Sequence, residues 1–351
     1  MIPYIIVLTI TVVVAIYILY KCRDKLEAYW EVFFTCAFIA IAAPFIFTPG
    51  TFWVATAWCI GLFIAAPVLA LTSCILSWKK FRPTSIFFGS LAVILLLVAI
   101  EAFIVEPEHI TVRHETLFSP KISKPTRIVV LADIQTDVVG KYEREVLEKA
   151  MKEKPDMIIM PGDYIQTTPA EKYFEQGKLL NKLFKDVNLS APLGIYALGG
   201  DMESWTTLWP QMFDGLSATL FTDTKTVETP DFTITGLSLK DSRFRCKTPE
   251  SKKFHIVFGH APDFSLNKPN GDLYIAGHTH GGQVQLPLIG PIVTFTDVPR
   301  KFAGGCFAKI NQNPDKYLMI SRGIGRERLG APQIRFLCLP EIVVIDLKPS
   351  K

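Results

Sequence analysis

Apolar residues run almost without interruption through the first 105 residues and recur periodically in the rest of the chain. Four stretches are long enough to cross about 30 Å of hydrocarbon as helices. They cover residues 2–20, 32–47, 52–78 and 86–105. Tyrosine and tryptophan side chains stand near their ends, where rings with a polar edge favour the membrane interface. The pattern predicts an all-α transmembrane domain of four helices over residues 1–105, with the lipid bilayer as its partner.

Basic residues in the short loops predict the orientation of these helices. The first loop contains Lys21, Arg23 and Lys25, and the third contains Lys79, Lys80 and Arg82, whereas residues 48–51 carry no charge. Because loops rich in lysine and arginine stay in the cytoplasm, both chain ends are expected on the other side. The protein is therefore predicted to be a multi-pass membrane protein whose soluble domain is extracytoplasmic.

Beyond residue 126, short β-rich runs alternate with helical periods. One helix is predicted over residues 141–154, ended by Pro155. Strands are predicted over residues 127–132, 157–160, 232–237, 254–258, 273–276, 317–321 and 334–346. Residues 106–126 are interpreted as a connector. With few helices between the later strands, residues 127–351 are expected to form an α/β domain of two packed sheets with helices outside.

Charge and cysteine usage exclude several classes of function. After residue 105 the chain has 31 basic and 29 acidic residues, an ordinary balance for a soluble domain. No basic patch indicates nucleic acid as a partner. The seven cysteines show no CxxC spacing, which argues against a disulfide framework and a structural zinc site.

The informative feature is how the predicted strands end. Apolar runs deliver metal-binding side chains at their carboxyl ends: Asp133 after IVVLA, Asp163 after IIMPG, Asp201 after IYALGG, His260 after HIVFG, and His278 and His280 after LYIAG. A glycine precedes most of them: Gly162, Gly200, Gly259 and Gly277. Ligand sites in such sheets lie beyond the strand carboxyl ends, so these side chains are expected to converge.

The ordered motifs resemble the calcineurin-like metallophosphoesterases, whose pattern is DxH, GDxx, GNH(D/E), GH and GHxH. The segments GHTHGGQVQLP, VPRKFAGG, SRGIG and LPEIVVIDL are similar to the membrane-associated branch of that family. The resemblance covers about residues 127–347. It implies a four-layer αββα sandwich with two divalent metal ions at the strand ends.

The resemblance also implies a role for each matching residue. Asp133 and His280 would hold the first ion, with Gln135 at the histidine position of DxH. Asp163 would bridge the two ions, and the second ion would be held by Asp201, His260 and His278. Asp163, Asp201 and His278 are expected to be catalytic, and Glu203 and Arg322 to contact the substrate. For Arg322 the alternative is a solvated basic loop.

Two departures from the family pattern affect the choice of metal. Gln135 replaces a histidine, and Asp201 replaces the asparagine of GNH(D/E). Three aspartates and one hydroxide balance the charge of two dications, so the exchanges compensate one another. The oxygen-rich set favours Mn²⁺, with Mg²⁺, Fe²⁺ and Zn²⁺ as alternatives.

Met202 replaces the histidine that the family is thought to use to protonate the leaving group or steady the phosphate. A thioether donates no proton, so the leaving group must already be good or be protonated by water or another residue. His255 is one candidate, and an ordinary surface histidine is the alternative. Asp137 is either an extra ligand of the first ion or a solvated loop carboxylate. The exchange favours pyrophosphates or activated diesters as substrates.

Taken together, these features predict a membrane-anchored dimetal hydrolase that cleaves a phosphodiester or pyrophosphate bond. Four spans exceed what tethering requires, which favours a phosphorylated lipid-linked or envelope substrate. One alternative is an enzyme like the UDP-2,3-diacylglucosamine pyrophosphatase of lipid A synthesis, although its cytoplasmic chemistry conflicts with the loop charges. The other is a non-catalytic metal-binding sensor or binding module that lost turnover through Gln135 and Met202.

Overall fold

The computed structural model describes residues 1–244, 246–310 and 316–350. The chain divides into two compact units. The first comprises Met1–Val105 with the short segment Arg328–Gln333, and the second comprises Glu106–Glu327 with Ile334–Lys351. We refer to them as the helical unit and the soluble unit.

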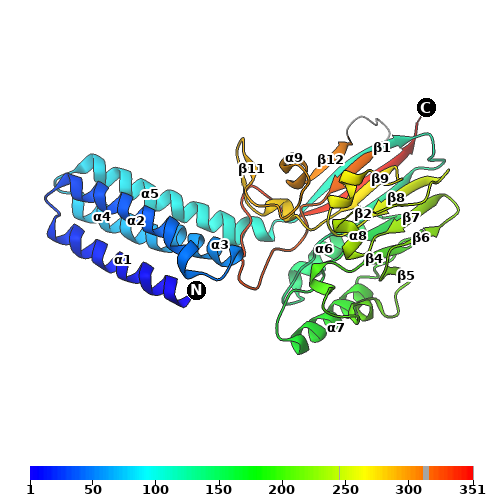
Figure 1. The fold of residues 1–351 in the computed structure, drawn as a ribbon, viewed down its shortest axis with the longest axis horizontal. Helices are drawn as coiled ribbons and strands as arrows, with labels where there is room; N and C mark the ends of the chain where they lie inside the picture. The colour runs from blue at the N-terminus through cyan, green and yellow to red at the C-terminus, as the bar shows by residue number, and fades with distance from the viewer. Residues whose placement is uncertain (245, 311–315, 351) are drawn as a thin grey trace. The chain divides into compact units, whose positions relative to one another are not determined.

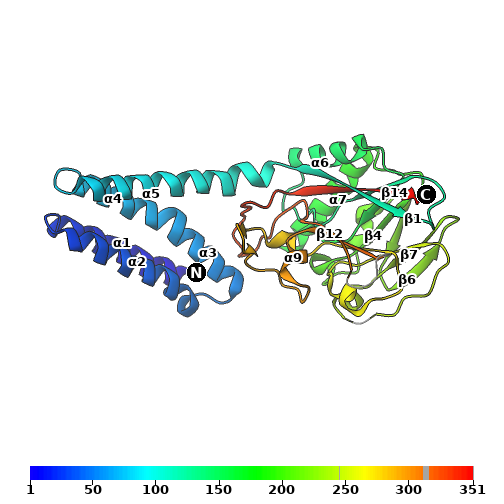
Figure 2. The ribbon, with the colours of Figure 1, turned by 90° about the horizontal axis from the view of Figure 1, so that it is seen from above.

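The helical unit contains four helical segments that are long and apolar enough to span a membrane. The first two are α1 (Ile2–Lys21) and α2 (Leu26–Phe47). The third is built from α3 (Thr51–Ile60), the π-helical turn η1 (Gly61–Ala65) and α4 (Ala66–Ser77). The fourth is built from α5 (Arg82–Ile100), the π-helical turn η2 (Glu101–Val105) and the 3₁₀ turn η3 (Glu106–Glu108). Figure 2 shows α4 and α5 running side by side.

A long apolar helical segment is present at each of the four predicted spans, and two are several residues longer than predicted: the fourth covers Arg82–Glu108 rather than residues 86–105. The second helix begins at Leu26 rather than at residue 32, so it has 22 residues, enough to cross a bilayer. The wider turn η1 lies immediately before Pro67. Proline has no N–H and crowds the carbonyl one turn earlier, so a local π-turn lets the span continue through it.

The soluble unit is built on two six-stranded sheets. The first has the order β1-β14-β2-β3-β4-β5 and contains β1 (Thr111–Ser119), β14 (Glu341–Pro349), β2 (Thr126–Val130), β3 (Met157–Met160), β4 (Ile195–Leu198) and β5 (Ala218–Phe221). The second has the order β12-β13-β9-β8-β7-β6 and contains β12 (Cys306–Lys309), β13 (Tyr317–Ile320), β9 (Leu273–Ala276), β8 (Phe254–Phe258), β7 (Phe232–Gly236) and β6 (Lys225–Glu228). A small hairpin joins β10 (Gln285–Leu286) to β11 (Gly290–Pro291).

Helices cover the outer faces of the two sheets. On the first sheet lie α6 (Lys141–Lys152) and α7 (Ala170–Asp186), which Figure 1 shows on one side of that sheet. Shorter elements lie over the second sheet: α8 (Leu239–Arg243), η6 (Asp263–Asn267) and α9 (Arg300–Ala303). The remaining 3₁₀ turns are η4 (Asp201–Glu203), η5 (Trp209–Phe213) and η7 (His280–Gly282).

Alternation along the strands creates the layers, because neighbouring strand residues point to opposite faces. In β2, Ile128 and Val130 pack between the two sheets, whereas Val129 packs under the helices. In β8, Ile256 faces the other sheet and Val257 faces the outer elements. The predicted four-layer α/β architecture behind a helical N-terminal part is confirmed.

Two sequence predictions differ from the structure. Residues 111–119, interpreted as part of a connector, form β1, which pairs in parallel with β14 from Thr111↔Glu341 onwards (Figure 1). The last strand begins at Glu341 rather than at residue 334. β1 reads TVRHETLFS, without the apolar alternation typical of a strand, and its partner lies more than two hundred positions away, so no local pattern marks this pair.

Candidate metal centre

The predicted ligands converge beyond the carboxyl ends of their strands. Asp133 follows β2, Asp163 follows β3, Asp201 follows β4, His260 follows β8, and His278 and His280 follow β9. Asp133, Asp163, His278 and His280 all have positive φ, between 48° and 69°. Such backbone is costly for residues with a side chain and persists only where surrounding contacts enforce it. Its concentration here is typical of a functional site.

Two glycines allow the loops to approach one another. A Cβ on Gly162, which has φ +96°, would lie 2.4 Å from the backbone nitrogen of Gly200. A Cβ on Gly277 would lie 2.6 Å from a carboxylate oxygen of Asp133. Side chains at these positions would push Asp163 and Asp133 away from the other ligands.

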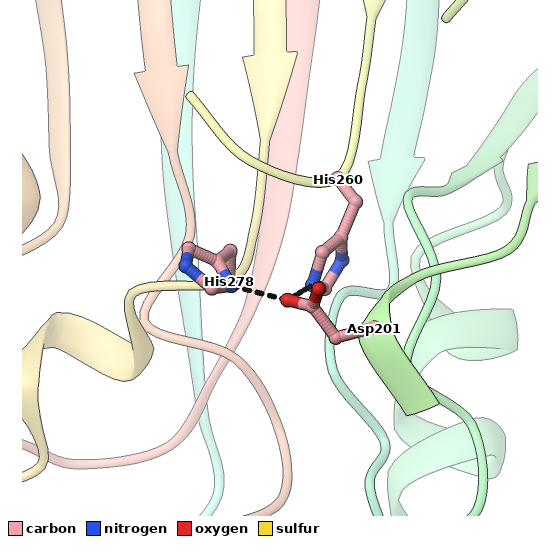
Figure 3. Close-up of side chains that lie close together, drawn as sticks. All are labelled: Asp201, His260 and His278. Atoms are coloured by element: carbon pink, nitrogen blue, oxygen red, sulfur yellow. Dashed lines mark ion pairs between the residues drawn. The ribbon is translucent and has the colours of Figure 1, made fainter. Parts of the chain in front are cut away.

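Asp201, His260 and His278 form one group in which the candidate ligand atoms lie within 4.8 Å of one another. Figure 3 shows both imidazole rings directed at the carboxylate. Asp201 Oδ2 lies 3.0 Å from His278 Nδ1 and 3.3 Å from His260 Nε2. Burial would raise the pKa of Asp201, but the hydrogen bonds from the two histidines outweigh it and hold the pKa well below its usual range.

The second nitrogen of each of these rings contacts a backbone carbonyl. His260 Nδ1 lies 2.9 Å from the carbonyl oxygen of Pro161, and His278 Nε2 lies 3.1 Å from that of Phe295. A carbonyl only accepts, so each of these nitrogens carries the hydrogen. In the neutral tautomers, His260 Nε2 and His278 Nδ1 therefore have the lone pairs that a metal requires.

Asp133, Asp163 and His280 form the second group, also within 4.8 Å, and all three are buried. Neither ring nitrogen of His280 has a hydrogen-bond partner in the described part of the chain, although the residue is 2% exposed. Burial, followed by the charge of Arg335, holds the pKa of His280 well below its usual value. Burial, with a contribution from Asp163, raises the pKa of Asp133 to about 7.

These observations fit a divalent metal pair. A buried imidazole without partners and crowded carboxylates are costly in a dry pocket unless a cation satisfies them. Asp163 connects the groups, because its Oδ2 lies 3.3 Å from His260 Nε2. Burial opposes protonation of His260, but the charge of Asp163 and the contacts with Asp163 and Asp201 raise its pKa well above the usual value.

Gln135 is buried beside the second group, with a φ of 36°. Its Nε2 donates to Gln166 Oε1 at 3.0 Å, and Gln166 Nε2 donates to Glu327 Oε2 at 3.0 Å. This chain of amides orients the Gln135 side chain with its nitrogen committed to Gln166. The half-buried Asp137 lies outside both groups of ligand atoms found in the described residues.

Glu203 does not face a substrate, contrary to the sequence prediction. Its carboxylate is 2% exposed and accepts three backbone N–H groups, those of Gly200 and Asp163 at Oε2 and that of Tyr164 at Oε1, at 2.8–2.9 Å. Burial, together with the charge of Asp163, raises its pKa to about 7. Glu203 therefore joins the Asp163 loop to the Asp201 loop.

Arg322, predicted to contact the substrate, binds Glu341 instead. Its Nε and Nη2 bind Glu341 Oε2 at 2.9 and 2.7 Å, and Glu341 is fully buried. The following turn is held by Arg335, whose buried guanidinium donates to the carbonyls of Arg322, Gly323 and Gly325. The SRGIG segment is thus a structural loop around Arg335, and Gly325 N–H donates to the Asp133 carbonyl at 2.6 Å.

Sequence reasoning missed Arg243, at the end of α8. Its Nη2 donates to Asp201 Oδ2 at 2.5 Å, and its side chain is 34% exposed. A partly exposed guanidinium therefore lies beside the group formed by Asp201, His260 and His278. His255, the candidate acid, is buried at the opposite end of β8 from His260 and contacts Thr235 Oγ1 at 2.8 Å, so it is remote from the ligands.

Comparison with known proteins agrees with this geometry. Residues 126–282 match the family model described as calcineurin-like phosphoesterase. The chain is 27% identical over 212 residues to the uncharacterized metallophosphoesterase YkuE of Bacillus subtilis, covering 56% of this chain and 69% of that protein. It is 23% identical over 244 residues to the phosphodiesterase YaeI of Escherichia coli, covering 67% of this chain and 87% of that protein. A metallophosphoesterase of Campylobacter jejuni, Cj0846, is 25% identical over 290 residues, 74% of this chain and 68% of its own.

Proposed function

Residues 126–282 match a calcineurin-like phosphoesterase domain, and the chain is a phosphoesterase hydrolase. From this premise we propose a mechanism and a substrate class for the enzyme. It is a membrane-anchored phosphodiesterase or pyrophosphatase that uses two divalent ions, and its substrate is lipid-linked. The observation that carries the metal assignment is the pair of buried ligand groups, with His280 unsatisfied at both ring nitrogens among the described residues.

Each ligand group supplies one ion site. Asp133 and His280 would hold the first ion, with Gln135 offering its amide oxygen, because its nitrogen is committed to Gln166. Asp201, His260 and His278 would hold the second ion. Asp163 would belong to both, since it is a member of one group and contacts His260 of the other. When bound, two such ions lower the pKa of a water and offset the charge of the phosphoryl oxygens.

The residues of the chain then determine which substrates react. Arg243 presents a guanidinium beside Asp201 and has further N–H groups for phosphate oxygens. Met202 cannot donate a proton, and its N–H is already bonded to Asp163 Oδ1 at 2.8 Å. The departing group must therefore leave as a stable anion, as a phosphate or nucleotide does. This supports an anhydride or an activated diester over a simple alkyl ester.

Manganese is the ion that we assign to the site. Seven side chains are proposed as ligands, and four of them, Asp133, Gln135, Asp163 and Asp201, offer oxygen. Oxygen-rich sets suit Mn²⁺ and Mg²⁺, whereas Zn²⁺ favours nitrogen and sulfur.

Membrane anchoring rests on the four long apolar helices. The basic loops Lys21–Lys25 and Lys79–Arg82 support a cytoplasmic position for both, with the soluble unit on the extracytoplasmic side. A C-terminal tag tests this arrangement in sealed right-side-out vesicles. External protease is expected to remove the tag without lysis, and removal only after lysis would place the soluble unit in the cytoplasm.

Hydrolysis is tested with the full chain in detergent, stripped of metal and reloaded with Mn²⁺. Bis(p-nitrophenyl) phosphate is a suitable probe because its leaving group needs no proton donor. Asp163→Ala is expected to lower kcat at least a hundredfold. The control Asp186→Ala, which removes only a surface ion pair with Arg144, should retain the wild-type rate. Equal rates in wild type and Asp163→Ala would show that these ligand groups do not carry the reaction.

A further inference from the structure

The hairpin formed by residues 285–295 carries a group of apolar side chains that the soluble unit does not cover. Ile289, Ile292 and Val293 are 40–57% exposed, and Leu288 at the tip is fully exposed. No residue from 284 to 296 is charged. Other large apolar residues exposed on this unit, such as Phe118 and Leu179, are far apart in sequence, as on most soluble proteins. A concentrated apolar tip is unusual for a surface in water.

The hairpin is built to project. Its strands pair at Leu286↔Gly290, so residues 287–289 form a tight turn. Leu288 has φ 67° and Gly290 has φ 78°. Positive φ is strained for leucine, and its fully exposed side chain is unfavourable in water. An apolar environment removes the second of these costs.

The base of the hairpin is fixed next to the point where the chain leaves its last apolar helix. Gln285 N–H donates to the Phe336 carbonyl at 3.0 Å. The next two residues, Leu337 and Cys338, donate their N–H groups to the carboxylate of Glu106 at 2.7 and 3.0 Å. Glu106 follows Val105 directly, and the fourth candidate span continues as helix to Glu108. The base of the hairpin is therefore joined to Glu106, the first residue of the soluble unit.

Basic side chains accompany the hairpin. The short helix α9 packs on β11, and its Arg300 and Lys301 are exposed. An apolar tip with adjoining cations is the pattern of segments that enter the interface of a bilayer, where the cations meet anionic headgroups.

We propose that the hairpin 285–295 inserts its apolar tip into the hydrocarbon edge of the same bilayer that the helical unit spans. The occupant of this surface is membrane lipid rather than a second protein. The insertion links the bilayer to the metal centre, because the Phe295 carbonyl at the end of the hairpin accepts the Nε2 hydrogen bond of His278. A lipid-linked phosphate would then reach the ligand groups without leaving the membrane surface.

This inference rests on the membrane anchoring proposed above, so the experiment reports on each separately. The full chain carries the photoreactive residue p-benzoylphenylalanine at a single position and is reconstituted in vesicles of phosphatidylcholine and phosphatidylglycerol. Leu288 tests the hairpin. Ile94, exposed on α5, tests the anchoring. Phe118, equally apolar and 60% exposed, lies near the far end of β1 and serves as the matched control.

After irradiation, mass spectrometry is expected to find phospholipid adducts at positions 288 and 94, at least tenfold above those at position 118. Adducts at 94 without adducts at 288 would overturn the hairpin insertion and leave the anchoring intact. Crosslinks from 288 to a second copy of the chain, or equal adducts at 288 and 118, would also overturn it. Absence of lipid at both 94 and 288 would reject the anchoring and the insertion together.

A second variant separates insertion from catalysis. Leu288→Ser is expected to leave hydrolysis of soluble bis(p-nitrophenyl) phosphate within twofold of wild type, because Leu288 contacts none of the ligand groups. For the lipid readout, p-benzoylphenylalanine replaces Ile289 in two proteins, one with Leu288 and one with Leu288→Ser. In the same vesicles, the protein with Leu288→Ser should give at least threefold fewer lipid adducts. Unchanged adduct yield would contradict a role for the tip.

Discussion

Replacing Glu203 with glutamine is the sharpest test of how the metal centre is held together. The two carboxylate oxygens accept three backbone N–H groups in a buried position. In Glu203→Gln one oxygen becomes an NH₂ group, which cannot accept. The smallest loss occurs when the NH₂ faces Tyr164, so that one hydrogen bond disappears and the other two lose their charge. The Tyr164 N–H left without an acceptor costs about 1–3 kcal/mol. Glutamine also removes a buried charge, whose burial raises the pKa of Glu203, and this offsets the weakening of the other two bonds. The variant should therefore lose about 1–3 kcal/mol of stability.

For a domain of this size that loss corresponds to a thermal unfolding midpoint lower by about 5 °C. The assay is tryptophan emission of the metal-free full chain at pH 8, where Glu203, with a pKa of about 7, is ionised. Manganese affinity should fall as well, because the Asp163 and Asp201 loops are no longer joined. Glu148→Gln, on the exposed face of α6, is the matched control and should unfold at the wild-type temperature. An unchanged midpoint with a raised KM would refute the structural role and restore Glu203 as a substrate contact.

Three further predictions follow from the same structure. Arg243→Ala should lower kcat/KM for bis(p-nitrophenyl) phosphate about 10–100-fold through loss of one charge-assisted contact, whereas Arg326→Ala, which removes a surface pair with Glu108, should stay within twofold. Equal effects of the two would deny Arg243 a place at the site. Burial lowers the pKa of His255 despite Asp272 and Glu228, so below pH 6.5 the unfolded chain binds a proton that the folded chain does not. Wild type should therefore lose more thermal stability than His255→Gln between pH 7 and 5.5, and parallel losses would argue against this. Metal-stripped enzyme should regain more activity with Mn²⁺ than with Zn²⁺, and strict zinc dependence would contradict the oxygen-rich assignment.

The carboxyl ends of the strands could be predicted from the sequence because their signals are local. The bounds predicted for residues 157–160, 254–258 and 273–276 are those of β3, β8 and β9. Each is a short apolar run ended by glycine and a polar residue, so neither the strand nor the direction of its ligand depends on distant parts of the chain. Within each sheet the ligands meet because of strand direction, since β2, β3 and β4 are parallel, as are β7, β8 and β9. The meeting of the aspartates with the histidines also requires the packing of the two sheets, which no local signal marks.

The orientation of charged side chains around the ligands was not predictable in the same way. Asp201 and Glu203 lie two residues apart in η4, yet one faces the histidines and the other the backbone of its own loops. Arg322 carries a phosphate-binding side chain in a suitable motif, but Glu341, buried at the start of β14, already binds it. Partners that arrive from distant segments decide these cases, and a single sequence does not reveal them.

Arg243 changes the charge balance inferred from the sequence. Three aspartates give the ligand set a charge of −3, which with one hydroxide neutralises two dications. The guanidinium on Asp201 Oδ2 reduces the charge contributed by these four residues to −2. With two dications and a hydroxide, the loaded centre would carry a surplus of one positive charge. A phosphodiester brings one negative charge, so the surplus favours its binding over that of a neutral ester. The aspartate at position 201 and the arginine at position 243 therefore act as one unit: the carboxylate strengthens the hold on the ion, and the guanidinium keeps the site attractive to an anion.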